Sequence, residues 1–429
     1  MSPTNRAVLL ATLSGLPAMS LSNAAARGQI FARESVSSSG VESTTTGGGF
    51  FNGAFNPSVS DDGRFVVFQS NANNLVDFEF TTGTQIYLRD RQLGTTTLVS
   101  RGTAGIGGNG ASELPKISGD GSTVVFQSAA SDLVTGDTNG SIDVFVWDRA
   151  SGNITRVSVS STGAQADRPA SDAFGPAISA DGRYVAFSST ASNLVTTPGG
   201  TNRSHIYRHD RQTGSTMRVS VTPAGTAAGS LSTTPTISGN GDRIAFRSAA
   251  SDLVPGDTNA INDIFIRTVS TQSITRVSLT STGGQITSGA PTVPAISRDG
   301  SVVLFFHTGN VTGSASTLTQ LYLRDLAAGT TTRITTGSGG EGTAVFSGDG
   351  SRVIFSTFTD NLVAGDTNGL EDVIAYDRAA GTLSQLTLIN GSPADGDFLQ
   401  GLRVQRGASF ASDRFEDAEI AEFQAITCG

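Results

Sequence analysis

The sequence contains very little cysteine and very little lysine. Cys428 is the only cysteine, so an internal disulfide is excluded and packing must stabilise the fold. Lys116 is the only lysine, and arginine supplies the remaining positive charge. The net charge is -9, which argues against nucleic acid as a partner because an acidic surface repels phosphates.

Long hydrophobic runs are also scarce. After residue 26, no segment reaches the roughly 18 consecutive apolar residues of a membrane-spanning helix. The one mostly apolar stretch, Ala7–Leu21, follows Arg6 and precedes the small residues Ala24–Ala26. This order predicts a secretory signal peptide over residues 1–26, cleaved near Ala26, and a mature chain that is secreted or periplasmic without a membrane span. The alternative is a disordered tail with a chance apolar run.

The composition favours an all-β fold. Charged residues make up only 15% of the chain, which is low for a disordered protein, and there are 52 glycines. Many short strands joined by glycine-rich turns have such a composition.

A repeated unit occupies most of the chain. It contains a turn of Asp-Gly or Asn-Gly type, and a phenylalanine stands five residues after each glycine. The six turns are Asp62-Gly63, Asp120-Gly121, Asp181-Gly182, Asn240-Gly241, Asp299-Gly300 and Asp349-Gly350, and the phenylalanines are Phe68, Phe126, Phe187, Phe246, Phe305 and Phe355. Such turns between apolar runs predict hairpins, because glycine accepts a positive φ.

Each unit is predicted to hold four strands. The second strand is apolar on both faces, as at Val66, Val67 and Phe68, which is typical of sheets packed radially against neighbours on either side. The sequence therefore predicts an all-β, six-bladed β-propeller of four-stranded antiparallel blades over residues 55–388, followed by a tail over 389–429.

Residues 27–54 are predicted to contain a closing strand and a linker. Ile30–Gly40 (IFARESVSSSG) is similar to Ile154–Gly163 (ITRVSVSSTG), a predicted fourth strand with its exit. Such a copy ahead of the first blade is expected to pair with the last blade and close the ring. Thr382–Leu388 competes for the same position.

Two segments carry a family resemblance. Pro176–Val195 (PAISADGRYVAFSSTASNLV) and Gly136–Gly163 (GDTNGSIDVFVWDRASGNITRVSVSSTG) resemble the PD40, or WD40-like, repeats of bacterial TolB-type propellers. The resemblance implies six blades. It implies no single activity, because such propellers serve as partner-binding platforms, as carbohydrate-active enzymes and as appendages of peptidases. No G-x-S-x-G elbow of a hydrolase occurs in the sequence.

The three histidines and the tryptophan are weak candidates for chemistry. His205 and His209 alternate on one predicted strand and share a face, which would suit a metal or a general base. His307 follows a second strand, and Trp147 would suit sugar stacking if it were exposed. Structural packing is the favoured interpretation for all four.

A loop that appears in alternate blades is the most informative pattern. It places Asp, Asn and Asp at loop positions one, three and seven. The residues are Asp137, Asn139 and Asp143, then Asp257, Asn259 and Asp263, then Asp366, Asn368 and Asp372, and the other blades carry Gln85, His205 and Gln320 at the third position.

These oxygen-bearing side chains predict calcium binding, since calcium prefers oxygen ligands. The alternative is a structural turn, in which the first aspartate forms an Asx-turn and the second accepts backbone N–H groups. Ala260, which replaces a glycine in the fourth blade, is expected to resist the positive φ of such a turn.

Two functions are compatible with these patterns. The first is an exported, non-catalytic propeller, expected to be monomeric, that binds a protein or glycan partner. The alternative is a secreted carbohydrate-active enzyme, a polysaccharide lyase or hydrolase, with its site in the propeller funnel.

Overall fold

The computed structural model describes residues 7–12, 30–43, 54–77, 83–170, 175–196, 203–309, 311–312, 318–336, 343–359, 362–366, 372–386, 388–389, 392–393 and 423–427. Every regular element in these ranges is a β-strand. Within this part of the chain, no helix has the length and apolar character that crossing a membrane requires.

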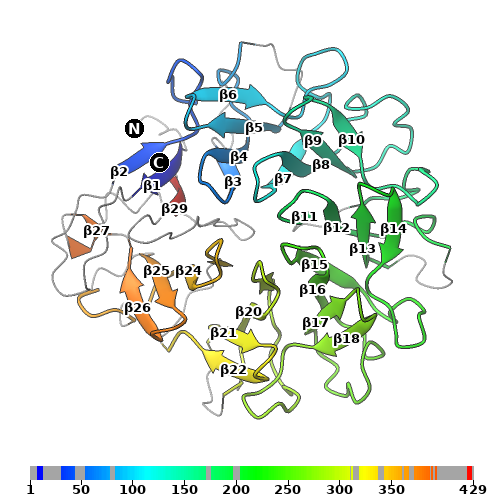
Figure 1. Ribbon diagram of the computed structural model, residues 1–429, viewed down its shortest axis with the longest axis vertical. Helices are drawn as coiled ribbons and strands as arrows, with labels where there is room; N and C mark the ends of the chain where they lie inside the picture. The colour runs from blue at the N-terminus through cyan, green and yellow to red at the C-terminus, as the bar shows by residue number, and fades with distance from the viewer. Residues whose placement is uncertain are drawn as a thin grey trace.

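Six four-stranded antiparallel sheets stand around a ring, numbered here blade one to blade six in chain order (Figure 1). Blade one contains β3 (Ala54–Val59), β4 (Phe65–Ser70), β5 (Gln85–Asp90) and β6 (Thr95–Leu98), and blade two contains β7 (Ser112–Ile117), β8 (Thr123–Ser128), β9 (Asp143–Asp148) and β10 (Ile154–Arg156). Blade three contains β11 (Ala177–Ile178), β12 (Tyr184–Ser189), β13 (His205–Asp210) and β14 (Ser215–Arg218), and blade four contains β15 (Ser232–Ile237), β16 (Arg243–Ser248), β17 (Asp263–Thr268) and β18 (Ser273–Arg276). Blade five contains β19 (Ala295–Ile296), β20 (Val302–His307), β21 (Gln320–Asp325) and β22 (Thr330–Arg333), and blade six contains β23 (Ala344–Phe346), β24 (Arg352–Thr357), β25 (Asp372–Asp377) and β26 (Thr382–Gln385). The predicted six-bladed propeller is confirmed.

The glycine turns form the first hairpin of every blade. All six glycines have a positive φ, for example 64° at Gly63 and 72° at Gly350. In blade one the Gly63 amide donates to the Ser60 carbonyl (2.9 Å), and the Ser60 hydroxyl donates to Asp62 (2.5 Å). The serine before each turn likewise donates to the side chain that shapes the turn, which is an aspartate in five blades and Asn240 in blade four.

The repeated phenylalanines lie in buried apolar clusters, which for all but Phe68 join two neighbouring blades. Phe68 stacks on Tyr87 of the third strand with ring centroids 5.8 Å apart, and Phe126 stacks on Phe145 at 6.0 Å. Strand β4 is buried on both faces, because Phe65 and Val67 pack against blade two while Val66 and Phe68 face the other way. This packing explains why the second strands do not alternate between apolar and polar residues.

The hairpin turns also contact one another from blade to blade. Backbone amides of four turns donate to the next turn: Asp61 to Gly119 (2.8 Å), Asp120 to Ala180 (3.2 Å), Ala180 to Gly239 (2.9 Å) and Gly239 to Arg298 (2.7 Å). The Arg298 side chain of blade five then forms an ion pair with Asp61 of blade one. This end of the ring is thus tied together by the turns themselves.

A three-stranded sheet fills the sector between blade six and blade one (Figure 1). It has the order β2 (Ile30–Arg33), β1 (Ala7–Thr12) and β29 (Phe423–Thr427), so both ends of the chain contribute to it. A two-stranded sheet, β27 (Leu388–Ile389) with β28 (Ser392–Pro393), also follows blade six. We call the three-stranded sheet the closing sheet.

The closing sheet changes the expected mode of closure. Ile30–Arg33 pairs with β1 and not with the last blade, where Thr382–Gln385 is the outer strand. The two competing segments therefore occupy different sheets. The following residues behave like the exit of a blade: the Thr96 hydroxyl donates to the Val36 carbonyl (2.5 Å), as Thr216 of blade three donates to Val159 (2.5 Å).

Candidate functional site

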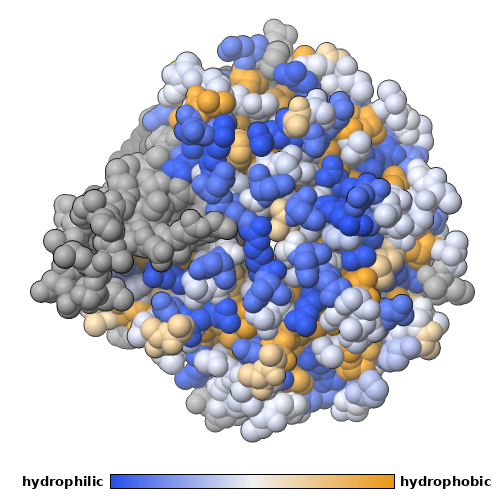
Figure 2. Space-filling model, in the orientation of Figure 1, coloured by the Kyte–Doolittle hydropathy of each residue, from blue (hydrophilic) through white to orange (hydrophobic). Residues whose placement is uncertain are grey.

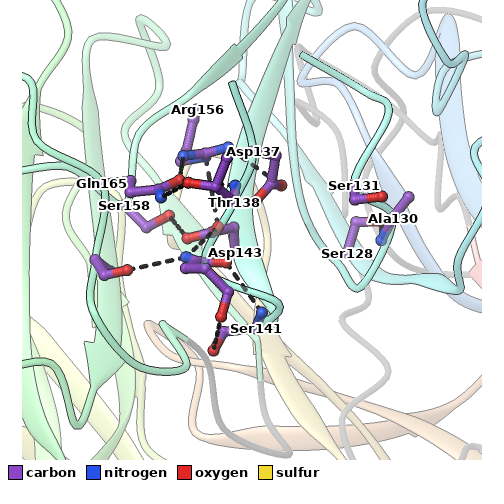
Figure 3. Close-up of polar contacts among 12 residues, drawn as sticks. Ser128, Ala130, Ser131, Asp137, Thr138, Ser141, Asp143, Arg156, Ser158 and Gln165 are labelled. Carbon is purple, nitrogen blue, oxygen red and sulfur yellow. Dashed lines mark hydrogen bonds and ion pairs between the residues drawn. The ribbon is translucent and has the colours of Figure 1, made fainter. Parts of the chain in front are cut away.

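The aspartate loop of blade two is a closed polar network (Figure 3). Asp143 begins strand β9 and is fully buried, with 0% exposure. Its carboxylate accepts from the Ser158 hydroxyl (2.5 Å) and from the Asn139 side-chain amide (2.8 Å). Asn139 also donates to the Ala166 carbonyl (2.9 Å), so the loop is attached to the outer strand and to its exit.

An arginine lies between the two aspartates of this loop. The Arg156 guanidinium is 3.1 Å from Asp137 Oδ2 and 3.4 Å from Asp143 Oδ2, and it also donates to Gln165 (Figure 3). All three charged side chains are almost completely buried. Buried carboxylates of this kind are costly without a nearby positive charge, and Arg156 supplies that charge.

Blade four repeats the network. Arg276 lies 3.3 Å from Asp257 and 3.7 Å from Asp263. Asn259 donates to Asp263 (2.9 Å), and the Ser278 hydroxyl donates to it as well (2.5 Å). Burial raises the pKa of Asp143 in blade two and of Asp257 in blade four, although neighbouring donors and the arginines act in the opposite direction.

The other blades show what the second aspartate does in the fold. The Ser100 hydroxyl donates to Gln85 (2.6 Å) and the Thr335 hydroxyl donates to Gln320 (3.1 Å), as Ser158 does to Asp143. In blade three, Ser220 and His205 Nδ1 are 3.4 Å apart. This position therefore links the third strand to the fourth in each of these blades, whichever residue occupies it.

The structure agrees with one part of the structural alternative and corrects two others. In blade four a backbone hydrogen bond from Asn259 to the first aspartate, Asp257, agrees with an Asx-turn. The second aspartate accepts from the side chains of Asn259 and Ser278 where turn amides were expected. Ala260 also adopts the left-handed conformation that it was expected to resist, with φ 55°.

In blade six, Asp366 and Asp372 are buried. Asn368, the middle member of that loop, lies outside the described residues. Among the described residues, no group of three or more His, Cys, Asp and Glu side chains comes together. Calcium binding at the three loops therefore stays a prediction.

The histidines and the tryptophan are packed within blades. His205, His209 and His307 are 0%, 6% and 0% exposed, and Trp147 lies in the apolar core between blades one and two. The His209 Nδ1 atom is 2.9 Å from the Thr216 hydroxyl. Burial lowers the pKa of His209, and it lowers the pKa of His307 to about 4. Packing, the favoured interpretation, agrees with these positions.

Sequence reasoning missed the arginines. Arg156 and Arg276 follow their second aspartates by 13 residues each, across a complete hairpin. Part of the signal was present, since two of the three Asp-Asn-Asp loops, those of blades two and four, precede a fourth strand with the residues ITR, whereas the loop of blade six precedes TLSQ. Blade five carries Arg333 in the same register without such a loop, so the arginine alone is not diagnostic.

Comparison with known proteins identifies solved structures that have a similar fold. The chain is similar to the β-propeller domain of the Trilobed protease from Pyrococcus furiosus, with TM-score 0.51 and 13% identity over 87% of this chain and 92% of that one. It is also similar to an oligogalacturonate lyase from Vibrio parahaemolyticus, with TM-score 0.52 and 10% identity over 98% of this chain and 97% of that one. TolB from Acinetobacter baumannii is another structural match, with TM-score 0.38 and 17% identity over 76% of this chain and 62% of that one.

This chain is a six-bladed β-propeller. The chain spans 62% of the length of the Acinetobacter TolB. A scan against protein-family models and a search of curated proteins find no match. The likeness to the Pyrococcus and Vibrio propellers, at 13% identity or less, describes the propeller fold alone.

Proposed function

We propose that this chain is an exported, non-catalytic β-propeller, acting as a monomer, that binds a protein or glycan partner on a loop-lined face. The observation that carries the proposal is where the chemically capable side chains lie. The three histidines are buried within blades, and the aspartates of blades two and four are occupied by arginine, asparagine and serine. Side chains buried in this way are not exposed to a substrate at the surface, which supports binding in preference to catalysis.

The surface supports recognition through polar contacts. Hydrophilic side chains surround the centre of the ring on the face shown in Figure 2. Among the described residues, the large apolar side chains that are exposed belong to separate segments: Val41, Leu93, Ile142, Leu231, Val293, Leu318 and Phe358. Scattered apolar residues of this kind do not form the continuous patch of an obligate apolar interface.

The alternative function is a secreted carbohydrate-active enzyme with its site in the propeller funnel. The match to the Vibrio oligogalacturonate lyase favours this alternative, because it extends over nearly the full length of both chains. The likeness is one of fold, so a lyase or hydrolase activity of this chain would need groups in the funnel that the buried networks do not provide.

A glycan array beside a polysaccharide activity screen separates the two functions. The folded protein is expected to retain specific glycans, or a defined protein partner, while oligogalacturonate and other polymers remain intact. Heat-unfolded protein is the control for nonspecific retention. Release of product from any polymer would overturn the proposal and support the enzyme.

A further inference from the structure

Arg247 stands at a position that is neutral in the other five blades. It is the fifth residue of the second strand of blade four, and it pairs with Thr233 of the first strand. The corresponding residues of the other blades are Gln69, Gln127, Ser188, Phe306 and Ser356. Blade four therefore carries a positive charge where its sister blades carry none.

This position lies close to the inner strands, at the end of the ring away from the hairpin turns. The first strands are nearest the centre (Figure 1), and Gln69 of blade one accepts from the backbone amide of Leu114 (2.7 Å) on the first strand of blade two. Arg247 shares a face of β16 with Ala245, which packs in the apolar cluster between blades four and five. Arg247 therefore faces blade five, where Val293 precedes the proline of the first strand as Leu114 does in blade two.

The Arg247 guanidinium is partly buried and unpaired. Its Nε atom is buried without a hydrogen-bond partner among the described residues. Burial lowers the pKa of Arg247, and no described carboxylate acts in the opposite direction, whereas Asp210 does so for Arg208 of blade three. A guanidinium has five N–H donors and no acceptor, so an unpaired one is suited to binding an anion.

Two exposed apolar side chains flank this guanidinium. Leu231 and Val293 are 45% and 39% exposed. Leu231 lies two residues before Thr233, so it is on the face of blade four that carries Arg247. The large side chains exposed at this point are aliphatic, and among the described residues the exposed aromatic side chain, Phe358, is in blade six. A ligand that combines a negative group with a small apolar group fits these neighbours better than a stacked sugar ring does.

We propose that Arg247 binds a carboxylate of a peptide segment of a protein partner, and that an apolar side chain beside this carboxylate contacts Leu231 and Val293. A guanidinium and a carboxylate form two parallel, charge-assisted hydrogen bonds. Because the chain has a net charge of -9, an acidic segment would be repelled elsewhere on the surface and directed to this cation. The inference rests on the proposed binding function, and it specifies the face of the ring and the charge of the ligand.

A peptide array tests this site. The probes are decapeptides that contain one aspartate or glutamate and one leucine at varied spacings, beside matched peptides with asparagine or glutamine in place of the acid. The folded parent is expected to retain the acidic peptides and to release the neutral ones. Arg247→Gln installs the residue of blades one and two, and it should weaken retention by about tenfold or more, since a charge-assisted pair is lost.

The melting temperature of Arg247→Gln separates binding from a structural role. The guanidinium has no partner to lose, so this variant should melt at the same temperature as the parent or higher. A lower melting temperature would show that Arg247 stabilises the fold, and it would contradict the inference.

Arg203→Gln is the matched control. Arg203 is exposed in the loop before β13, at the same end of the ring, so its loss removes the same charge and should leave peptide retention intact. Val293→Glu should instead abolish retention, because it supplies Arg247 with a carboxylate from the chain itself.

Several outcomes would overturn the inference. One is a parent that retains no acidic peptide, and another is retention that Arg247→Gln leaves unchanged or that Arg203→Gln weakens equally. Oligogalacturonate tests a carboxylate carried by a glycan, and its retention through Arg247 in place of the peptides would contradict a peptide ligand. A glycan or protein partner that is retained equally by the parent and by Arg247→Gln would overturn this inference while the proposed binding function stands.

Discussion

The six blades and the closing sheet are built in different ways. Each blade is a contiguous stretch of chain whose strands follow one another in order, whereas the closing sheet joins β1 and β2 from one end of the chain to β29 from the other. Blades two to five also pack their two apolar faces against neighbours of the same design. The blades therefore depend on local sequence, and the closure of the ring depends on both chain ends.

Blade one shows what the closing sheet contributes. Its outward apolar cluster, which includes Val66, Phe68 and Tyr87, is buried, yet among the described residues it contains side chains of blade one only. The segment at residues 34–43 is attached to the same blade, with Glu34 paired to Arg91 (3.2 Å). The chain end thus takes the place that a preceding blade would take.

The middle strand of the closing sheet, β1, overlaps the predicted signal peptide. Ala7–Thr12 forms β1, and the same residues lie in the apolar stretch of the predicted signal peptide. Cleavage near Ala26 would remove β1, and the sheet order does not pair β2 with β29. Processing is therefore expected to alter the closing sheet while leaving the six blades as they are.

The largest expected effect comes from breaking this sheet. Deleting residues 27–39 removes β2 and the hydrogen bonds from Thr96 to Val36 and to Ser38. We expect loss of soluble protein, because an unpaired edge and an apolar face become exposed. Solubility after expression and thermal melting measure this. A truncated chain that melts like the parent would show that the segment does not hold the ring closed.

The next largest effect is a loss of stability caused by a substitution within blade four. Arg276→Met leaves the buried Asp257 and Asp263 without their positive charge, and such changes cost about 3–5 kcal/mol. Denaturant unfolding measures the loss. The control is Arg333→Met, at the same register in blade five, where Gln320 replaces the aspartate. Equal losses in the two variants would contradict the role assigned to Arg276.

Acid should weaken blade five through His307. Its ring nitrogens are buried without hydrogen-bond partners among the described residues, and burial lowers its pKa to about 4. The unfolded chain binds this proton near its ordinary pKa of about 6.5, so the free energy of unfolding should fall between pH 6.5 and 4 by about 3 kcal/mol.

Denaturant unfolding across this pH range isolates the effect of His307. His307→Gln cannot take up the proton, so its free energy of unfolding should fall less steeply than that of the parent. Identical pH profiles would exclude His307 as the source.

The smallest effects concern single turns. Ala260 and Gln272 have φ 55° and 57°, in the left-handed region where sister blades use Gly140 and Gly152. Replacing either one with glycine should stabilise the protein by about 0.5–1 kcal/mol, because glycine adopts this conformation without a Cβ clash. Gly152→Ala is the converse control, since no atom lies within 4 Å of the added Cβ and only backbone strain is introduced. A gain in stability on that change would contradict the explanation.

The sequence predicts those features that depend on neighbours along the chain. The turns at Gly63 and its five counterparts, and the phenylalanines that follow them, lie within one hairpin, where turn chemistry and strand pattern are sufficient. The hydrogen bond between the third and fourth strands, as from Ser158 to Asp143, could be anticipated only in part, because Gln85 fulfils the same role with different chemistry.

Contacts between segments that are distant along the chain could not be predicted from the sequence. The pairing of β1 with β29 joins segments more than 400 residues apart, and no local pattern indicates it. Arg156 reaches Asp137 across 19 residues, so the charge compensation that decides the chemistry of the loop became apparent only in the folded chain. The left-handed Ala260 shows that the surrounding network can impose a conformation that local preference opposes.

Hydrogen exchange of the full-length chain and of a chain beginning at Arg27 tests the central comparison most directly. If the blades are self-contained and the chain ends cover blade one, removing residues 1–26 should accelerate exchange in β3 to β6 and leave blades two to five protected. Unchanged protection in blade one, or a loss of protection spread evenly over all the blades, would contradict this account.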